Sequence, residues 1–414
     1  MLRFDLLHAP REDGQVLIEP AVSTWRGLIE DHVRAHSATH EGLLMAGVPL
    51  GTVRRQTRQR LFGLEPSAGS VGESPAESGG RASSPPGIGQ VERRAAGRDP
   101  ALRRDGSCTS EEAGRMPAPQ EGQTVQPTTA LAPLVIACGH QPEFIHPGVW
   151  AKNVVVHHVA RAAGTHGAIL VVDNDAPRST GLTVPAIDAE GYITARVIPL
   201  LNGVAAAAYE GRSPLEPAAI EALQRGVGSA ASDSVIGEYC RGLATAAHPR
   251  DFVEQHLAAR AGIDRTLGAD LHELRVSRAF DGPFVADVLL NLERFARDYN
   301  ASLAAYRHEQ RVRGVDRPLP DLKRDGDRIE APFWIYQPLQ QRRRLWVAGR
   351  HETVVLHADA QAIAEVARRD LLRDPTGALA GLSPWVVRPR SLTLTLWARL
   401  LVCDLFVHGI GGAK

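Results

Sequence analysis

The sequence predicts an α/β fold, in which helices flank a Rossmann-like parallel sheet. Two short apolar runs, 134–138 and 168–172, have the length and composition of buried strands. A stretch with helical character, 149–163, lies between them, and this strand–helix–strand order is typical of a parallel sheet with crossover helices. The chain has 414 residues, of which 43% are hydrophobic, so two or three domains with a sizeable core are expected.

Three segments of the chain differ in composition. Residues 1–65 carry apolar side chains such as Trp25 and Leu28 at helical spacing, which predicts a helical N-terminal segment. Residues 66–130 hold one leucine, one isoleucine and no aromatic residue. We expect a long disordered insertion there, because so little apolar area cannot offset the entropy of ordering the chain. Residues 131–414 form the predicted nucleotide-binding core.

The rest of the core is predicted from its hydrophobic periodicity. The expected strands are at 193–200, 331–336, 344–356 and 386–388, and the expected helices at 215–225, 252–261, 284–312 and 359–372. The apolar stretch 391–407 is compatible with a helix or a strand, and a glycine-rich turn follows it directly. From this ending we expect that a natural C-terminal portion is absent from the sequence.

Charge, cysteine content and hydropathy exclude several classes of protein. Lysine plus arginine equals aspartate plus glutamate at 47 each, so no overall charge attracts nucleic acid or an anionic membrane. The four cysteines form no CxxC pair, which argues against a disulfide framework or a structural zinc site. The most apolar stretch, 392–407, carries Arg399 and Asp404 and is shorter than the ~20 residues of a membrane span. We expect a soluble, cytoplasmic protein without a metal site, a nucleic-acid partner or a membrane anchor.

The segment 139–153, GHQPEFIHPGVWAKN, follows the first predicted strand. Ligands of open parallel sheets bind beyond the carboxyl ends of the strands, and a helix N-terminus there suits a phosphate. The glycine permits close backbone approach, the imidazoles and the ammonium can contact a phosphate, and the amides add hydrogen bonds. The candidate residues are Gly139, His140, Gln141, His146, Lys152 and Asn153. The alternative interpretation is an ordinary strand-to-helix loop, and the segment lacks the glycine pattern of a phosphate-binding loop.

A second candidate segment, DNDAPRST at 173–180, follows the second predicted strand. Carboxylates such as Asp173 and Asp175 at a strand end can bind a metal, a ribose hydroxyl or a substrate amine, or act as a general base. Ser179 can contact an anion. The alternative interpretation is a turn with a helix cap, since these residue types favour both on local grounds.

A third candidate segment, 382–414, combines an Arg-Pro-Arg sequence with a glycine-rich turn. Arg388 and Arg390 can bind a phosphate or a carboxylate in bidentate fashion. Gly409, Gly411 and Gly412 can admit a ligand close to the backbone. The alternative interpretation is a structural arginine followed by a helix C-cap.

Together these motifs resemble the family of bacillithiol-biosynthesis cysteine-adding enzymes. GHQPEFIHPG is similar to the family's Thr-Gly-Gln-Gln-Pro segment, LSPWVVRPR to its Ser-Pro-Asn-Val-Leu-Leu-Arg-Pro block, and HGIGGAK to its Gly-Gly-Pro-Gly turn. The resemblance covers about 134–414 and implies a Rossmann-like core that binds an adenine nucleotide, with Gly139, Gln141 and Arg388 near the site. The sequence departs from the family in having Cys138 for threonine, and the family's coiled-coil arm has no counterpart here.

The first segment also resembles the His-Gln-Pro opening of WbqC-like proteins. More loosely, HPGVW is similar to the His-x-Gly-His motif of nucleotidylyltransferases, with Val149 in place of the second histidine.

Our leading hypothesis is a ligase or transferase of the cysteine-adding type, which joins an amino acid or small amine to a sugar-linked or other small acceptor. In this hypothesis His140 and His146 contact phosphate or a developing anion, Asp173 and Asp175 hold an amine or act as general base, and Arg388 clamps an anion. An adenine nucleotide and Mg²⁺ are the candidate cofactors, and a homodimer is the candidate assembly. The alternatives are a nucleotidylyltransferase and a non-catalytic protein that retains a nucleotide-binding fold.

Overall fold

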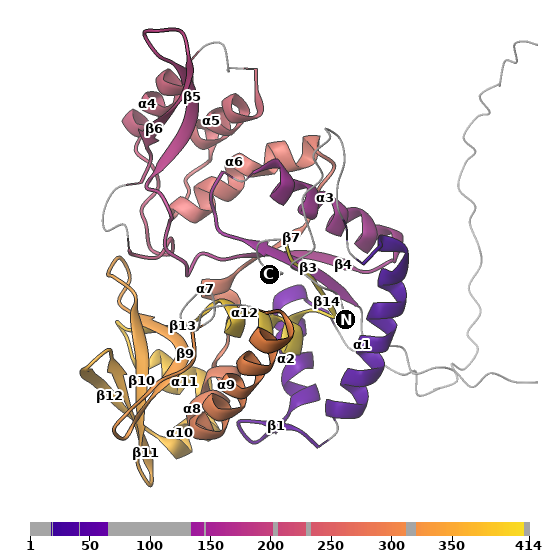
Figure 1. Cartoon of the computed structure of the whole chain (residues 1–414), viewed down its shortest axis with the longest axis vertical. Helices are drawn as coiled ribbons and strands as arrows, with labels where there is room; N and C mark the ends of the chain where they lie inside the picture. Colours follow the sequence, from indigo (N-terminus) through magenta and orange to yellow (C-terminus); the bar gives the residue numbers. More distant parts are fainter. Residues whose placement is uncertain are drawn as a thin grey trace, which may run out of the picture. The chain divides into compact units, whose positions relative to one another are not determined.

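The structure is a computed structural model in which a mixed α/β unit contains a four-stranded parallel sheet flanked by helices (Figure 1). The residues that it describes are 18, 20–40, 42–64, 134–144, 146–201, 206–228, 233–311 and 320–409. The insertion predicted at 66–130 therefore lies outside the described residues.

The parallel sheet has the strand order β14-β3-β4-β7. Its strands are β3 (Val135–His140), β4 (His166–Val171), β7 (His272–Arg275) and β14 (Leu405–Val407). The first four residues of β3 and the last four of β4 are buried and largely apolar, as expected for parallel strands that are covered on both faces. The predicted strand–helix–strand unit is confirmed, with helix α3 (Pro147–Ala162) connecting β3 to β4.

Alternate side chains of β3 and β4 pack against different helices. Ile136, Cys138 and Ile169 share one buried cluster with residues of α1 (Trp25–His40) and α3. Successive side chains of a strand point to opposite faces of the sheet, so these helices cover one face. The helix predicted within 1–65 thus belongs to the same core as the sheet.

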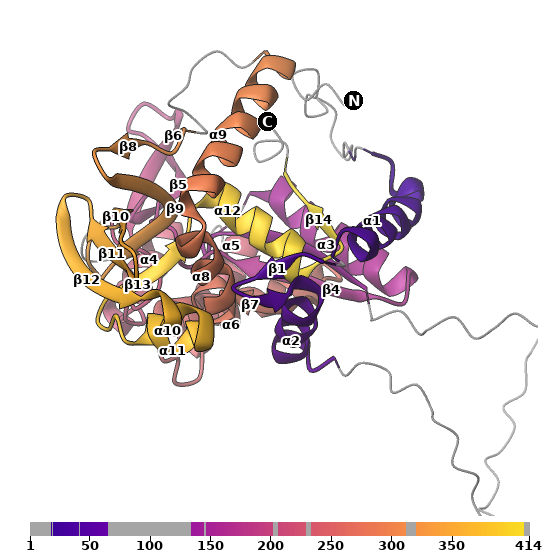
Figure 2. The ribbon, with the colours of Figure 1, turned by 90° about the horizontal axis from the view of Figure 1, so that it is seen from below.

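The opposite face of the sheet belongs to the largest buried cluster of the described residues. Ala137 and Leu170 lie there together with side chains of α2 (Leu50–Phe62), α8 (Gly282–Leu290) and α12 (Ser391–Trp397). Figure 2 shows α12 running between α9 and the strands of the parallel sheet. The core therefore continues from the parallel sheet through these helices into the C-terminal part of the chain.

A second sheet is antiparallel, with the order β12-β11-β10-β9-β13 and β8 paired to β9. Its strands are β8 (Arg324–Asp325), β9 (Arg328–Tyr336), β10 (Arg343–Gly349), β11 (Thr353–Ala358), β12 (Gln361–Ala367) and β13 (Val386–Pro389). The helix predicted over 359–372 is wrong for its first half, because pairing with β11 makes 361–367 a strand and only 368–373 is helical. Since β13 leads directly into α12, this sheet is tied to the helices under the parallel sheet.

A β-hairpin and three helices lie between β4 and β7. They are β5 (Gly181–Ile187), β6 (Ile193–Pro199), α4 (Pro217–Val227), α5 (Val235–Thr245) and α6 (Phe252–Thr266), and they share a separate apolar cluster. The remaining elements are the 3₁₀ turn Val22–Thr24, β1 (Leu44–Met45), β2 (Val48–Pro49), α7 (Val276–Ala279), α9 (Leu292–Glu309), α10 (Arg368–Arg373), α11 (Pro375–Ala380) and the π-helical turn Ala398–Val402. The strand predicted at 193–200 and the helices predicted at 215–225 and 252–261 are confirmed, whereas the helix predicted over 284–312 is divided into α8 and α9, and α5 and β7 were not predicted.

A buried carboxylate, Asp404, fixes the last strand of the sheet. Its two oxygens accept hydrogen bonds from Arg54 (2.7 Å), from Arg58 (2.5 Å) and from the backbone N–H of Val135 (2.8 Å). Asp404 is 5% exposed, and both arginines of α2 are buried with it. Its own backbone N–H donates to the Val135 carbonyl at 2.8 Å. One side chain thereby joins α2, β3 and the start of β14.

We predict that Asp404→Asn lowers the free energy of unfolding by about 3–5 kcal/mol, because it leaves two buried guanidinium groups without a counter-charge. Urea denaturation measures this difference. The matched control is Glu30→Gln, which removes an exposed pair with Arg26 and is expected to cost less than about 1 kcal/mol. Equal effects of the two substitutions would contradict the central role given to Asp404.

Candidate ligand-binding site

The order of strands in the parallel sheet reverses beside β3. The chain moves from β3 to β4 and β7 on one side, and then returns so that β14 pairs with the other side of β3. In open α/β sheets, ligands bind at such a switch point, in the crevice beyond the carboxyl ends of the strands. His140 is the last residue of β3 and His408 follows β14 directly. These two imidazoles therefore lie where such a fold places its ligand.

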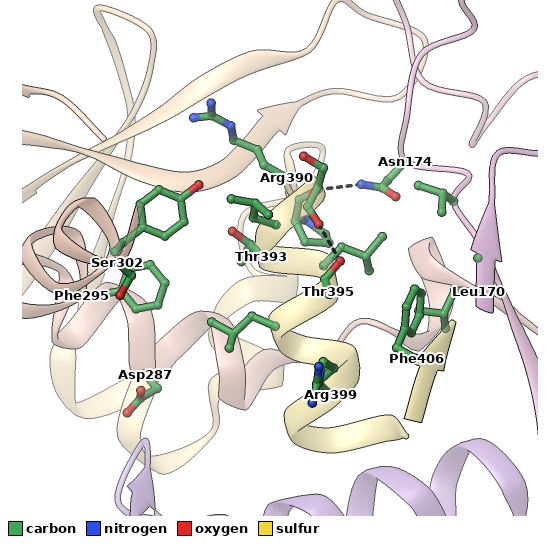
Figure 3. Close-up of a pocket in the computed structure, with 18 of the residues that line it drawn as sticks. Leu170, Asn174, Asp287, Phe295, Ser302, Arg390, Thr393, Thr395, Arg399 and Phe406 are labelled. Atoms are coloured by element: carbon green, nitrogen blue, oxygen red, sulfur yellow. Dashed lines mark hydrogen bonds between the residues drawn. The ribbon is translucent and has the colours of Figure 1, made fainter. Parts of the chain in front are cut away.

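A large cleft opens at this edge of the sheet. Its volume is about 2120 Å³, whereas pockets for one small molecule have about 300–1,000 Å³. Figure 3 shows α12 running through this region, with Leu170 and Phe406 of the parallel sheet on one side and Phe295 and Ser302 of α9 on the other. The cleft thus has room for two small reactants, or for a nucleotide together with an acceptor.

Gly139 brings the strands around the switch point close together. A Cβ atom at this position would lie 3.2 Å from the Leu170 carbonyl oxygen and 3.4 Å from the Phe406 ring. The backbone carbonyl of Gly139 accepts a hydrogen bond from the Lys152 ammonium at 2.7 Å. The glycine therefore allows close packing of β3 with the side chains of β4 and β14, and its carbonyl directs Lys152 toward the end of β3.

At the switch point beside β3, the ammonium of Lys152 affects the protonation of two imidazoles. Burial lowers the pKa of Lys152. Burial also lowers the pKa of His140, and the Lys152 ammonium lowers it further. Partial burial and the same ammonium lower the pKa of His408 to about 4. Near neutral pH both imidazoles are uncharged, so each can accept a proton or a hydrogen bond.

A chain of hydrogen bonds extends from Gln141, in the loop after β3, across the cleft. The Gln141 amide donates to Asp175 Oδ2 at 2.8 Å, and Arg342 donates to Asp175 Oδ1 at 2.6 Å. The backbone N–H of Ala176 also donates to Asp175 Oδ1 at 2.9 Å. Asp175 thus holds the guanidinium of Arg342, from the loop before β10, beside the end of β4.

An aromatic ring holds two arginines on the opposite wall. The guanidinium carbons of Arg342 and Arg390 lie 4.9 Å and 5.2 Å from the centroid of Trp334, which is cation–π distance. Arg390 donates to the fully buried carboxylate of Glu330 at 2.6 Å, and Arg344 approaches the same carboxylate at 3.3 Å. The guanidinium groups of this wall are therefore held in place without a ligand.

The carboxylate of Asp173 has structural partners in the interior. It is fully buried and accepts hydrogen bonds from Arg275 at 2.9 Å and from the Ser277 backbone N–H and hydroxyl at 2.8 Å and 2.5 Å. Arg275 in turn binds both oxygens of Asp251. Asp173 lies outside the cleft lining, so the geometry favours Asp175 for contact with a ligand.

Arg388 is also engaged by a neighbouring side chain. Its guanidinium makes hydrogen bonds of 3.0–3.2 Å to both oxygens of Glu210, which also accepts from the Tyr336 hydroxyl. Arg388 is not among the residues that line the cleft. Arg390, which directly precedes α12, lies at the cleft instead (Figure 3).

Four other predicted site residues are described by the structure and do not line the cleft. His146 caps α3 by accepting the Gly148 N–H at 3.0 Å, and Ser179 closes a turn with Gly181. Asn153 is buried and accepts from the Cys138 thiol at 3.3 Å. Gly409 is exposed, and a Cβ atom added there would have no neighbour within 4 Å. Gly411 and Gly412 lie outside the described residues.

The cleft brings together five of the predicted residues, which are Gly139, His140, Gln141, Asp175 and Arg390. Sequence reasoning missed the contributions of His408, Trp334 and Arg342. The sequence signals for them were the run of arginines at 342–344, which local pattern does not distinguish from a solvated turn, and the histidine that opens the HGIGGAK segment. Among the described residues, no group of three or more histidine, cysteine, aspartate or glutamate side chains is arranged to hold a metal ion.

No protein-family model matches the chain, and no match is found among the curated proteins. None of the helices in the described part of the chain is long and apolar enough to cross a membrane.

A buried histidine behind the site predicts a pH-dependent stability. His256 is fully buried, its Nδ1 lies 2.8 Å from the Tyr239 hydroxyl, and its Nε2 has no partner among the described residues. Burial lowers its pKa well below 6.5, and the charge of Arg260 acts in the same direction. The folded state therefore binds fewer protons than the unfolded state below about pH 6.5.

We expect this contribution to stability to be complete above about pH 6.5 and to be lost as the pH falls, by up to about 1.4 kcal/mol per pH unit. Urea denaturation between about pH 7.5 and about pH 5.5, values spanning the ordinary histidine pKa of about 6.5, measures the slope. His256→Gln is expected to flatten it, whereas His351→Gln at an exposed position leaves it unchanged. An identical slope in the His256 variant and the wild type would refute this assignment.

Proposed function

We propose that this chain binds a nucleotide, or a similar phosphate-bearing small molecule, at the carboxyl edge of a Rossmann-like sheet. The reaction that we propose is a ligation or transfer of the cysteine-adding type, which joins a small amine or amino acid to a small acceptor. The observation that carries the proposal is the position of Lys152, His140 and His408 at the switch point beside β3. A half-buried ammonium beside two uncharged imidazoles attracts an anion at the place where α/β sheets bind their ligands.

The opposite wall of the cleft supports the same ligand class. Arg342, Arg344 and Arg390 line this wall, which we call the arginine wall. The exposed side chain of Arg178, in the loop after β4, also lines the cleft. Guanidinium groups bind phosphate and carboxylate oxygens in bidentate fashion. The indole of Trp334 offers an aromatic surface between two of these arginines. In this proposal a nucleotide places its phosphates between the arginine wall and the end of β3.

His140 is the group best suited to proton transfer. Its lowered pKa keeps the imidazole unprotonated at neutral pH, as a general base for an amine nucleophile requires. Asp175 already accepts hydrogen bonds from Gln141, Arg342 and a backbone N–H. We therefore assign Asp175 the role of holding Arg342, and His140 the role of accepting the proton.

A second candidate function is a non-catalytic protein that binds a nucleotide. The observation that favours it is that several charged groups of the cleft already have partners within the chain, as Arg342 does in Asp175 and Arg390 in Glu330. This alternative predicts nucleotide binding without turnover.

We predict that a nucleotide raises the melting temperature in a panel of ATP, ADP, AMP and CTP, measured with and without Mg²⁺. A ligand at about 100 times its dissociation constant adds about 2.7 kcal/mol of stability, which thermal unfolding detects easily. Arg390→Gln is expected to weaken binding about tenfold or more, since it removes a guanidinium from the cleft wall. Arg350→Gln is the matched control, because Arg350 pairs with Glu365 at an exposed position.

Absence of a shift with every nucleotide, or an equal shift in Arg390→Gln and Arg350→Gln, would overturn this placement. Where binding is seen, incubation with amino acids separates the candidate functions. A new amine-linked product supports the transfer reaction, Mg²⁺-dependent pyrophosphate release supports a nucleotidylyltransferase, and binding without any product supports the non-catalytic alternative.

We further predict that His140→Ala lowers turnover by about 10²–10⁴-fold when an amine acceptor has been found, because a general base contributes about that factor. The pH profile of turnover is the readout that separates catalysis from folding. The wild type should lose activity as the pH falls and His140 is protonated, and the variant should lack this acid limb. A variant with wild-type turnover would remove His140 from the mechanism.

A further inference from the structure

The hairpin formed by β5 and β6 presents an uncharged face to the solvent. The strands pair in antiparallel register with Ile187 opposite Ile193, and the residues that alternate with these share their face of the hairpin. We call this face the outer hairpin face, and we define it by Thr183, Ile187, Ile193, Ala195 and Val197. None of the five carries a charge.

The opposite face of the hairpin packs against the protein. Val184 and Ile198 are buried there, in a cluster with Ile220 and Leu223 of α4 and Leu243 of α5. Figure 1 shows these two helices beside the hairpin, whose tip extends beyond them. The outer hairpin face is therefore the side that the described helices leave uncovered.

The exposure of the outer hairpin face is unusual for residues of this kind. Ile187, Ile193 and Val197 are 75%, 83% and 58% exposed, and Tyr192 in the adjoining turn is 71% exposed. An antiparallel sheet with one face in water normally alternates apolar and polar residues, whereas a sheet that is apolar on both faces is covered on both. Contiguous exposed apolar surface of this kind marks an interaction site.

We propose that the outer hairpin face binds the same face of a second copy of this chain, giving a dimer with twofold symmetry. A twofold interface brings a surface against itself, which a face without charge allows because no like charges are opposed. The two hairpins would stack face to face at about 10 Å, the spacing of packed sheets. Pro185 has no backbone N–H, and it therefore disfavours the alternative in which another strand extends the hairpin along β5.

The size of the face determines how strong such a dimer can be. The four exposed side chains offer about 400 Å² of apolar surface per copy, or about 800 Å² in the dimer, which corresponds to a small and weak interface. A reversible dimer is therefore the expected state at high protein concentration.

Sedimentation velocity of the full chain over a concentration series tests the proposal. The wild type is expected to shift from one chain mass toward two as its concentration rises. Ile193→Asp is expected to raise the dimer dissociation constant at least tenfold, because it places two carboxylates against an apolar face. Thr194→Asp is the matched control, since Thr194 is the next residue of β6, is also exposed, and belongs to the other face.

A second variant on the same face, Ile187→Ser, checks that the effect belongs to the face and not to one residue. Both isoleucines are largely exposed, so the melting temperatures of the monomeric variants should match that of the wild type at low concentration. A wild type that stays monomeric throughout the series, or a dimer that Ile193→Asp and Thr194→Asp weaken equally, would overturn the proposal.

Discussion

The Asp404 carboxylate is the interaction on which the arrangement of the site depends. It binds Arg54 and Arg58 of α2 and the first N–H of β3, and its own backbone starts β14 beside that strand. Without this contact, a strand of only three residues would have little to fix its register. The contact therefore places β14 next to β3 and creates the strand reversal at which His408 lies near the end of β3.

The cleft is formed by two sheets that share one core. β13 pairs with β9 in the antiparallel sheet and continues into α12, whose buried Trp397 packs in the cluster beneath the parallel sheet. Arg390 stands at the junction of these elements, as the residue that precedes α12. Any movement between the sheets would change the distance between the arginine wall and the end of β3. Because the two sheets share one core, this distance is restrained.

Local pattern was enough to predict the parallel unit around β3, α3 and β4, because continuous apolar runs and a helical period between them are short-range signals. It failed where long-range pairing decides the outcome. Residues 361–367 have few strong strand formers, yet pairing with β11 makes them a strand. The same limit applies to the site, since Arg342 binds Asp175 and Arg390 binds Glu330, and the residues of each pair are distant in sequence.

The charges around the cleft are the basis of our proposal that its ligand is an anion. Asp175 and Glu330 each hold an arginine at short distance, and the indole of Trp334 supports two guanidinium groups. Side chains held in this way lose little conformational entropy when a ligand arrives, which leaves more of the interaction free energy for affinity. Among the described residues that line the cleft, arginines outnumber carboxylates, and Lys152 adds a further positive charge near the end of β3. In our proposal a phosphate bound here would offset the excess of positive charge that remains after these ion pairs are formed.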